Sequence, residues 1–458
     1  MRRCGSRVLK LRPPSFAYEA GRRQRFPFST FTIADIPEVK EAKICAERGD
    51  WGGALQLLDR ASMVLSSVPE MKMQTMSRAA DIHQKQGDIS KEISERQRIL
   101  QLAAESGSSQ YVPLAAKALS IALLRGGELD KAVMHNIEAL QDVKNQNSLI
   151  RMGSQLVTAV ILTHHPRRSG EVLGIIDGVV AECSKEGSAG KAQGEGEGSD
   201  DQALEMEKNL AATRCVGELV RVRYYHHSQD SGRRGIGDDN SSQHISAPTT
   251  AAAAAGTALA EAHSLLEGHM SGDEALRHPT LLLLGVSSSL GELSGVCLAA
   301  RGSCYGVLED ASIALEETCL NKAIKRFEAM EEEGGEKGSL YLANALRSLA
   351  KLRGRKGDGV VAEGLFRSVL SKLNQFPKSI LEAELRIATL RDYAALLEKM
   401  EWNGRSRKPE GDKLFLEASA TEQEMFKEKT GENTEPHNIH IGSITDQWLL
   451  NAFGRMPF

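Results

Sequence analysis

The sequence predicts an all-α fold in which stacked antiparallel helical hairpins form a right-handed superhelical solenoid. Three observations predict it. Helix-forming residues dominate the 458-residue chain, and aromatic residues make up only 5% of it, which is few for the pleated faces of a β-sandwich or barrel. Apolar residues recur at the spacing of an amphipathic helix. A short turn centred on glycine also returns at nearly constant intervals, which is typical of repeat architectures.

The first residues differ from the rest of the chain in composition. Residues 1–30 are rich in Arg, contain Glu19 as their one acid, and lack the continuous apolar core of a secretory signal. This composition predicts a mitochondrial-type transit peptide over residues 1–30, processed shortly after Arg25. A plastid leader shares the composition, and a basic tail on a cytoplasmic protein is the remaining alternative.

The repeat begins with a glycine in a short polar turn. The matching glycines are Gly49, Gly87, Gly127 and Gly357, of which the first three are 38 and 40 residues apart. In three copies a small residue follows the glycine after five positions and mostly apolar residues follow after nine and twelve. These residues are Ala54, Leu58, Ala61, Ala132, Asn136, Ala139, Ala362, Phe366 and Val369. In the second copy these positions hold Glu92, Arg96 and Ile99, so only its turn fits the pattern. A further step of 40 reaches Arg167, with Val172, Ile176 and Val179 at the matching positions.

This series is similar to the tetratricopeptide repeat. Its turn-glycine, aromatic, Ala, aromatic, Ala positions are matched by Gly49, Trp51, Ala54, Leu58 and Ala61. The best copies are residues 35–68 and 343–376, the copy starting at 113 is good, and those around 73, 153 and 309–333 are degenerate. The resemblance implies hairpins that bury their faces by stacking and that line a concave groove with the first helix of each repeat.

Composition divides the chain into an N-terminal helical repeat array (35–183), a helix (203–227) and a C-terminal array (251–427). Residues 184–202 and 228–250 are rich in Gly, Ser and acids, and they are predicted to be disordered linkers. Residues 428–458 show no repeat and are predicted to be a tail or a capping helix, with Ile444–Phe453 covering the last hydrophobic face.

No catalytic, cofactor-binding or metal-binding motif is found in the sequence. The pairs His164-His165 and His226-His227 are adjacent, and neighbouring residues of a helix point about 100° apart, so neither pair is expected to hold one metal ion. We therefore predict a protein that is not an enzyme and needs no cofactor. The formal charge of −4 argues against nucleic acid as a partner, and no apolar run is long enough for a transmembrane segment.

The implied groove lining gives candidate partner-binding residues. In the 343 repeat they are Asn344, Arg347 and Lys351, which together with Arg353 and Arg355 would make a basic patch suited to an acidic peptide. In the 113 repeat they are Lys117, Ile121 and Leu124, a mainly apolar lining suited to an amphipathic helix.

These features predict a non-catalytic scaffold for protein–protein interaction. The favoured form is an organellar adaptor or assembly factor, in the mitochondrial matrix or at the inner membrane, that holds a segment of a client protein in its groove. A cytosolic scaffold of the kinesin-light-chain type is the alternative. An organellar RNA-binding repeat protein is less favoured, because such binding requires phosphate neutralisation and base stacking.

Overall fold

The computed structural model describes most of the chain. The described residues are 33–107, 111–142, 148–165, 167–192, 200–234, 246–270, 281, 284, 286, 288–305, 313–332, 340–376, 379–402, 405–429 and 443–455. The predicted transit peptide over residues 1–30 lies outside them.

The described residues form an all-α structure apart from one very short hairpin. The first helices are α1 (Pro37–Glu47), α2 (Trp51–Val64), α3 (Pro69–Gln86), α4 (Ile89–Glu105), α5 (Tyr111–Arg125), α6 (Leu129–Asp142), α7 (Ser148–Leu162) and α8 (Val172–Ala192). The later helices are α9 (Asp200–Arg234), α10 (Ser246–Gly268), α12 (Leu290–Tyr305), α13 (Ile313–Glu332), α14 (Leu340–Arg355), α15 (Gly359–Leu373), α16 (Ile380–Glu398), α17 (Lys408–Lys429) and α18 (Ile444–Gly454). Short 3₁₀ helices are η1 (Ile33–Asp35), η2 (Leu65–Ser67) and η3 (Ser169–Glu171), and strands β1 (Glu401–Trp402) and β2 (Arg405–Ser406) pair antiparallel.

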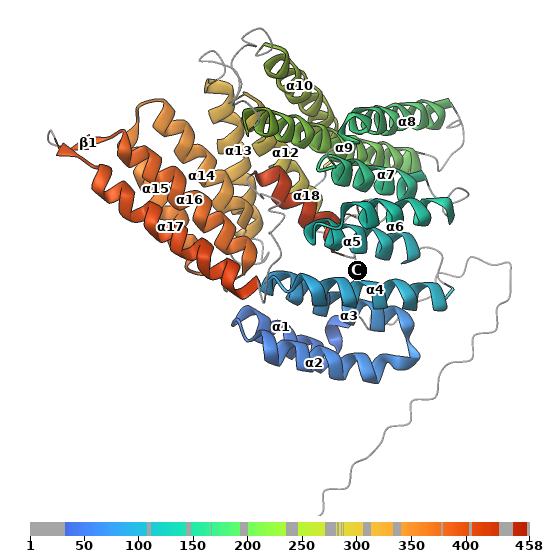
Figure 1. Ribbon diagram of the computed structural model, residues 1–458. Coiled ribbons are helices and arrows are strands. Elements are labelled where there is room, and N and C mark those ends of the chain that lie inside the picture. Colours follow the sequence, from blue (N-terminus) through green and yellow to red (C-terminus); the bar gives the residue numbers. More distant parts are fainter. Residues whose placement is uncertain are drawn as a thin grey trace, which may run out of the picture.

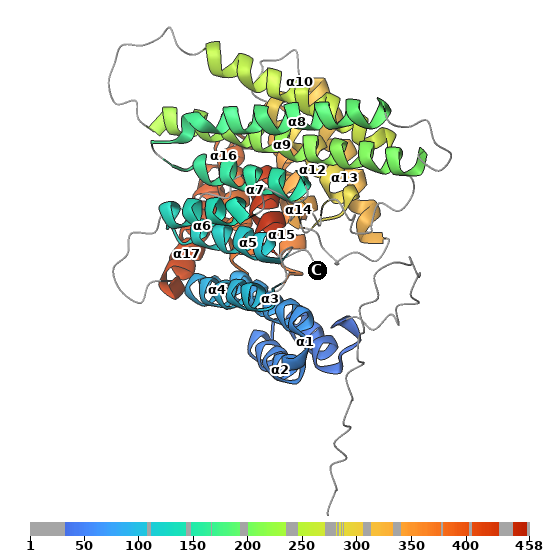
Figure 2. The same ribbon diagram turned by 90° about the vertical axis from the view of Figure 1, so that its right-hand side faces the viewer.

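From α1 to α17, each helix packs on the helices that precede and follow it in the chain. The successive pairs from α1 to α10 lie one above another (Figure 2). This arrangement confirms an all-α, helical-repeat-like architecture. Among the described residues, none of the helices has the length and hydrophobicity that a membrane-spanning helix needs.

The predicted turns have the expected backbone geometry. The four turn glycines have positive φ angles of 79°, 76°, 77° and 84° at Gly49, Gly87, Gly127 and Gly357. Each donates its N–H to the carbonyl three residues earlier, and the next residue donates to the carbonyl five residues earlier. This is the Schellman arrangement, which ends a helix with a left-handed residue and favours glycine there. Asp50 then caps α2 by accepting a hydrogen bond from the N–H of Gly53 at 2.9 Å.

The positions five, nine and twelve after each turn are buried in every copy, including the one that follows Arg167. In the second copy Glu92 is 0% exposed and Arg96 is 1% exposed. Arg96 donates to Asp81 of α3 at 2.6 Å, and Glu92 accepts from Arg125 of α5 at 2.8 Å. The second copy is therefore a complete hairpin in which paired charges replace the usual apolar residues, because buried charges are tolerated when they are paired.

The two predicted disordered linkers are in part helical. Helix α8 continues to Ala192 and α9 starts at Asp200, so residues 184–192 and 200–202 are helical. Likewise α9 continues to Arg234 and α10 starts at Ser246. In these stretches the helices extend into the segments expected to be linkers, because each residue added to an existing helix gains one backbone hydrogen bond without the cost of nucleation. Residues 193–199 and 235–245 lie outside the described residues.

The array brings its two ends together. Helix α3 contacts α16, and a Cβ built on Gly87 at the end of α3 would lie 2.5 Å from Cδ1 of Ile380 at the start of α16. The first hairpins thus meet the last ones (Figure 1).

Helix α18 does not cap the last repeat. It packs mainly on α5, α9, α12 and α14, in the middle of the molecule (Figure 1). The predicted helix at Ile444–Phe453 is present, but its position differs from the one expected. Residues 447–454 are all buried, and a helix that is mainly apolar all round has to be covered on every side, which the end of an array cannot do.

Candidate functional site

The candidate site is the set of helix faces that surround α18. We call the sides of α5, α9, α12 and α14 that pack on α18 the inner face. It is built from helices that come from both predicted arrays, and α18 and part of the segment between α10 and α12 cover it.

The structure brings two of the predicted groove residues, Ile121 and Asn344, against α18, while Arg347 and Lys351 face Asp392 of α16. All of the predicted groove residues except Lys351 are buried: Lys117, Ile121, Leu124, Asn344 and Arg347. Asn344 donates a hydrogen bond to Oε1 of Gln447 in α18 at 3.2 Å. Ile121 faces the end of α18, since a Cβ built on Gly454 would lie 3.1 Å from its side chain. Asn344 and Ile121 are therefore covered by another segment of the same chain.

The predicted basic patch is neutralised by neighbouring acids. Arg347 donates to Asp392 of α16 at 2.7 Å, and Lys351 lies 3.7 Å from the same carboxylate. Arg353 and Arg355 pair with glutamates of α13. Each of these cations therefore has a carboxylate partner in a neighbouring helix, and an acidic peptide would have to compete with these pairs.

The first turn of α18 is held by Arg223 of α9. The Arg223 guanidinium, 1% exposed, forms an ion pair with Asp446 and donates to the carbonyl oxygen of Val160 at 3.2 Å. It also contacts Nε2 of His164, in the turn that follows α7. Burial, followed by the nearby charge of Arg223, lowers the pKa of His164 to about 2, so this imidazole is neutral beside the guanidinium.

Two side-chain pairs hold the middle of α18. Besides the bond between Asn344 and Gln447, the indole N–H of Trp448 donates to Oγ of Ser288 at 3.1 Å. Trp448 is 0% exposed, and a buried indole N–H needs such an acceptor.

The C-terminal end of α18 meets α3 and α5. Arg125 donates to the carbonyl oxygen of Leu450 at 3.4 Å, and Gln84 donates to Oδ1 of Asn451 at 3.0 Å. A Cβ built on Gly454 would overlap Nη2 of Arg125, so a larger residue at this position would have to displace the end of that side chain. Helix α18 is therefore contacted by polar side chains along its whole length.

Apolar burial supplies most of the stabilisation. The side chains of Trp448, Leu449, Leu450 and Phe453 are at most 1% exposed. At about 1.5–3 kcal/mol for each fully buried side chain, these four contribute up to roughly 6–12 kcal/mol relative to exposure in water.

A second segment of the chain covers the inner face beside α18. Leu281, Leu284 and Val286 are fully buried between α10 and α12. The carbonyl oxygen of Leu284 accepts a hydrogen bond from Nζ of Lys117 at 2.9 Å, and a Cβ built on Gly153 of α7 would lie 2.2 Å from the same oxygen. Burial lowers the pKa of Lys117 to about 7.

Two polar clusters elsewhere resemble reactive sites but lack their geometry. Nε2 of His263 lies 2.8 Å from Oγ of Ser294, and Glu267 lies 3.6 Å from the same nitrogen. A Ser-His-acid triad requires the acid at Nδ1 and a serine that substrate can reach, whereas Ser294 is 0% exposed. Among the described residues, no three or more His, Cys, Asp or Glu side chains are grouped so as to hold a metal ion.

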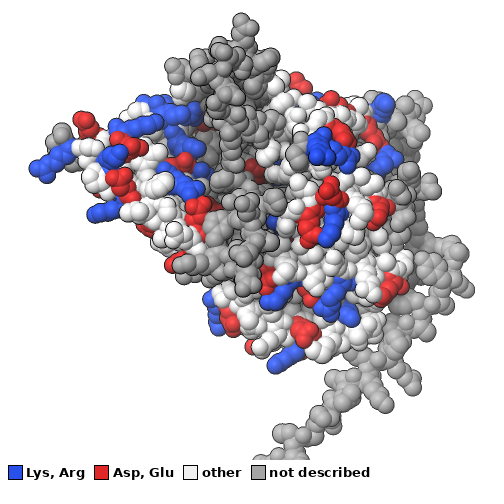
Figure 3. Space-filling model, viewed as in Figure 1, with Lys and Arg blue, Asp and Glu red and all other residues white. Residues whose placement is uncertain are grey.

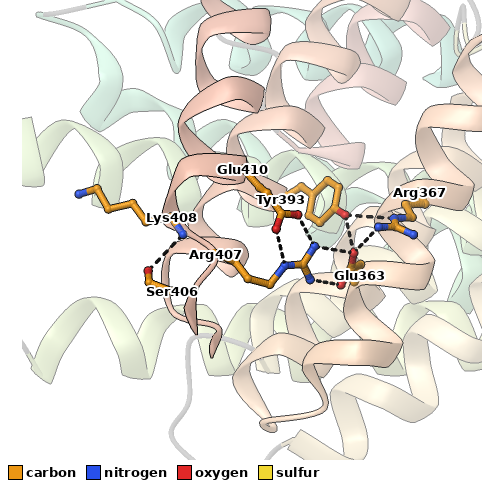
Figure 4. A network of polar contacts seen from close by, with 7 residues as sticks. All are labelled: Glu363, Arg367, Tyr393, Ser406, Arg407, Lys408 and Glu410. Carbon is orange, nitrogen blue, oxygen red and sulfur yellow. Dashed lines mark hydrogen bonds and ion pairs between the residues drawn. The ribbon is translucent and has the colours of Figure 1, made fainter. Parts of the chain in front are cut away.

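The second cluster joins α15, α16 and the start of α17 (Figure 4). Arg407 donates to Glu363 and to Glu410, and the hydroxyl of Tyr393 donates to Glu363 at 2.9 Å. Hydrogen bonds from Arg407 lower the pKa of Glu363 despite its partial burial. Each charge in the cluster has a counter-charge, so it is suited to fixing the last hairpin and not to acid–base chemistry.

The fold thus defines a class, an all-α protein of helical-repeat-like architecture whose inner face holds its own C-terminal helix. No protein-family model matches the chain, and no curated protein matches its sequence. Function is therefore inferred from the inner face and from the sequence.

Proposed function

We propose that this chain is a non-catalytic scaffold of the tetratricopeptide kind that binds a helical segment of another protein. The observation that carries the proposal is the way α18 is held. Side chains of α3, α5, α9 and α14 contact its polar groups while the surrounding helices bury its apolar ones. Holding an amphipathic or apolar helix against a helical array is a common mode of peptide recognition.

We further propose an organellar adaptor or assembly factor, at the mitochondrial matrix or inner membrane. The support is the Arg-rich, acid-poor composition of residues 1–30. A cytosolic scaffold of the kinesin-light-chain type is the alternative if these residues do not direct import. Binding of RNA is less supported, because Lys and Arg side chains lie among Asp and Glu over the face drawn in Figure 3 and many of them are ion-paired.

Proximity labelling in the native cell tests this function. A biotin ligase is fused to the C-terminus of the full chain and of a form that lacks residues 1–30, and the ligase alone is the control. We expect the full chain to label a reproducible set of matrix or inner-membrane proteins that the shorter form does not label. Labelling of the same cytosolic proteins by both forms would refute the organellar assignment, and labelling no different from that of the ligase alone would refute the scaffold function.

A further inference from the structure

Helix α18 is bound as a ligand would be bound and not as one more repeat. The helices from α1 to α17 pack on their neighbours in the chain, whereas α18 packs mainly on α5, α9, α12 and α14. Its contacts are also directional. A charged or amide side chain of the array meets Asp446, Gln447, the Leu450 carbonyl and Asn451 in turn.

We propose that the inner face is an exchangeable binding site for a helix with the chemistry of α18, which α18 fills until a client helix replaces it. This proposal rests on the scaffold function proposed above and names the class of partner. The client segment has the pattern of residues 446–454 of this chain, DQWLLNAFG. Its defining residues are an acid in the first helical turn, a Trp two residues later and Leu-Leu directly after the Trp. Asn, Phe and Gly then follow three, five and six residues after the Trp.

The site explains three parts of this pattern, the acid, the Trp and the Gly. Arg223 is buried and needs a carboxylate, because an uncompensated buried guanidinium is costly. Ser288 faces the indole N–H, so a Trp gains a hydrogen bond that Phe or Leu cannot form. At Gly454 any larger residue would displace Arg125 from its place between α18 and Glu92. A helix that lacks these groups leaves buried polar atoms without partners, which gives specificity as well as affinity.

A client helix can bind the inner face only after α18 has left it. Residues 447–454 are all buried, so α18 leaves only when helices around it separate. It is also joined to the array by the chain, which gives it a high effective concentration. If α18 fills the inner face in about 99% of molecules, the apparent affinity of a free client helix is lowered about 100-fold.

The test removes the covalent connection and keeps the whole chain. A full-length variant carries a recognition site for a specific protease within residues 430–442, a polar stretch with the sequence TGENTEPHNIHIG. After cleavage, a fluorescently labelled peptide of residues 443–458 is added and its anisotropy is followed over time. The uncut variant and a scrambled labelled peptide of the same composition are the controls.

We expect saturable uptake of the labelled peptide by the cut protein, with an apparent affinity about 100-fold tighter than that of the uncut protein. Peptides with Asp446→Asn or Trp448→Ala should bind at least about tenfold more weakly. A cut protein that keeps its helical circular dichroism but takes up no peptide would overturn the proposal, because α18 would then be a permanent part of the core. Loss of helical structure on cleavage would overturn it in the same way.

These outcomes are distinguishable from failure of the scaffold function. If proximity labelling identifies clients but the peptide does not exchange, the clients use another surface and this inference alone fails. If the peptide exchanges but labelling matches that of the ligase alone, the scaffold function fails.

Discussion

Lys117 gives the most direct test of whether the predicted groove is buried. Its ammonium group is enclosed beside the Leu284 carbonyl, and burial lowers its pKa from the ordinary value of 10.5 to about 7. Between these two pKa values the unfolded chain binds more protons than the folded chain. The free energy of unfolding therefore rises with pH between about 7 and 10, and the stability lost through this lysine is greatest at and below pH 7.

The size of the effect follows from the two pKa values. At about 1.4 kcal/mol for each pKa unit, keeping Lys117 buried costs about 4 kcal/mol at pH 7. Replacing it in Lys117→Met removes this cost but also removes the hydrogen bond to Leu284, worth about 1–2 kcal/mol. We therefore expect Lys117→Met to be more stable than the wild type by about 2–3 kcal/mol at pH 7 and less stable by about 1 kcal/mol at pH 10.

Urea unfolding followed by far-UV circular dichroism at both pH values measures these differences. The matched control is Lys351→Met, because the other predicted groove lysine has a side chain that is 52% exposed. That variant should change the free energy of unfolding by less than about 1 kcal/mol, equally at both pH values. If Lys117→Met behaves like the control, Lys117 is in contact with water and the inner face is open.

Three further predictions concern the packing and charges around the inner face. Gly153→Ala should lower the free energy of unfolding by about 2–4 kcal/mol, because its Cβ would meet the Leu284 carbonyl. The control Gly178→Ala has open space in α8 and should raise this free energy by up to about 1 kcal/mol. Equal effects of the two substitutions in urea unfolding would contradict the close approach at Gly153. Lowering the pH from 8 to 5 should reduce the free energy of unfolding by about 2 kcal/mol through His164. Its folded pKa of about 2 lies below the unfolded value near 6.5, so the unfolded chain takes up the proton first and stability is lost as the pH falls below 6.5. An unchanged pH dependence in His164→Gln would argue against this. Glu92→Gln should cost about 3–5 kcal/mol, because Arg125 loses the carboxylate with which it is paired while Arg96 keeps Asp81. A change below about 1 kcal/mol in thermal unfolding would show that the cluster is hydrated.

The turns were predictable because they depend on neighbouring residues alone. A glycine followed by Asp, as at Gly49 and Gly87, encodes a left-handed residue and the next helix cap within a few positions. For the second hairpin the sequence predicted the turn but not the packed helix, because the buried Glu92 and Arg96 are partnered by residues from other helices. A pattern of apolar spacing carries no information about such partners.

The position of α18 could not be predicted from local spacing. Its contacts join residues far apart in the sequence, such as Arg223 with Asp446, which are separated by 223 positions. Nothing local distinguishes Arg223 in the sequence, because Glu218 and Arg221 lie in the same helical stretch and are charged as well. Only the folded structure shows that Arg223 is buried against α18.

Among the described helices, α18 is the last to be synthesised. A chain is made from its N-terminus, so every helix that packs on α18 exists before it does. Until then Arg223 and the apolar side chains that contact α18 lack the cover that this helix gives them. A nonsense or frameshift mutation just before Ile444 would delete very little of the chain, yet it would remove Trp448 and Phe453 from the centre of the structure. We expect such late truncations to act on the whole protein and not only on its end.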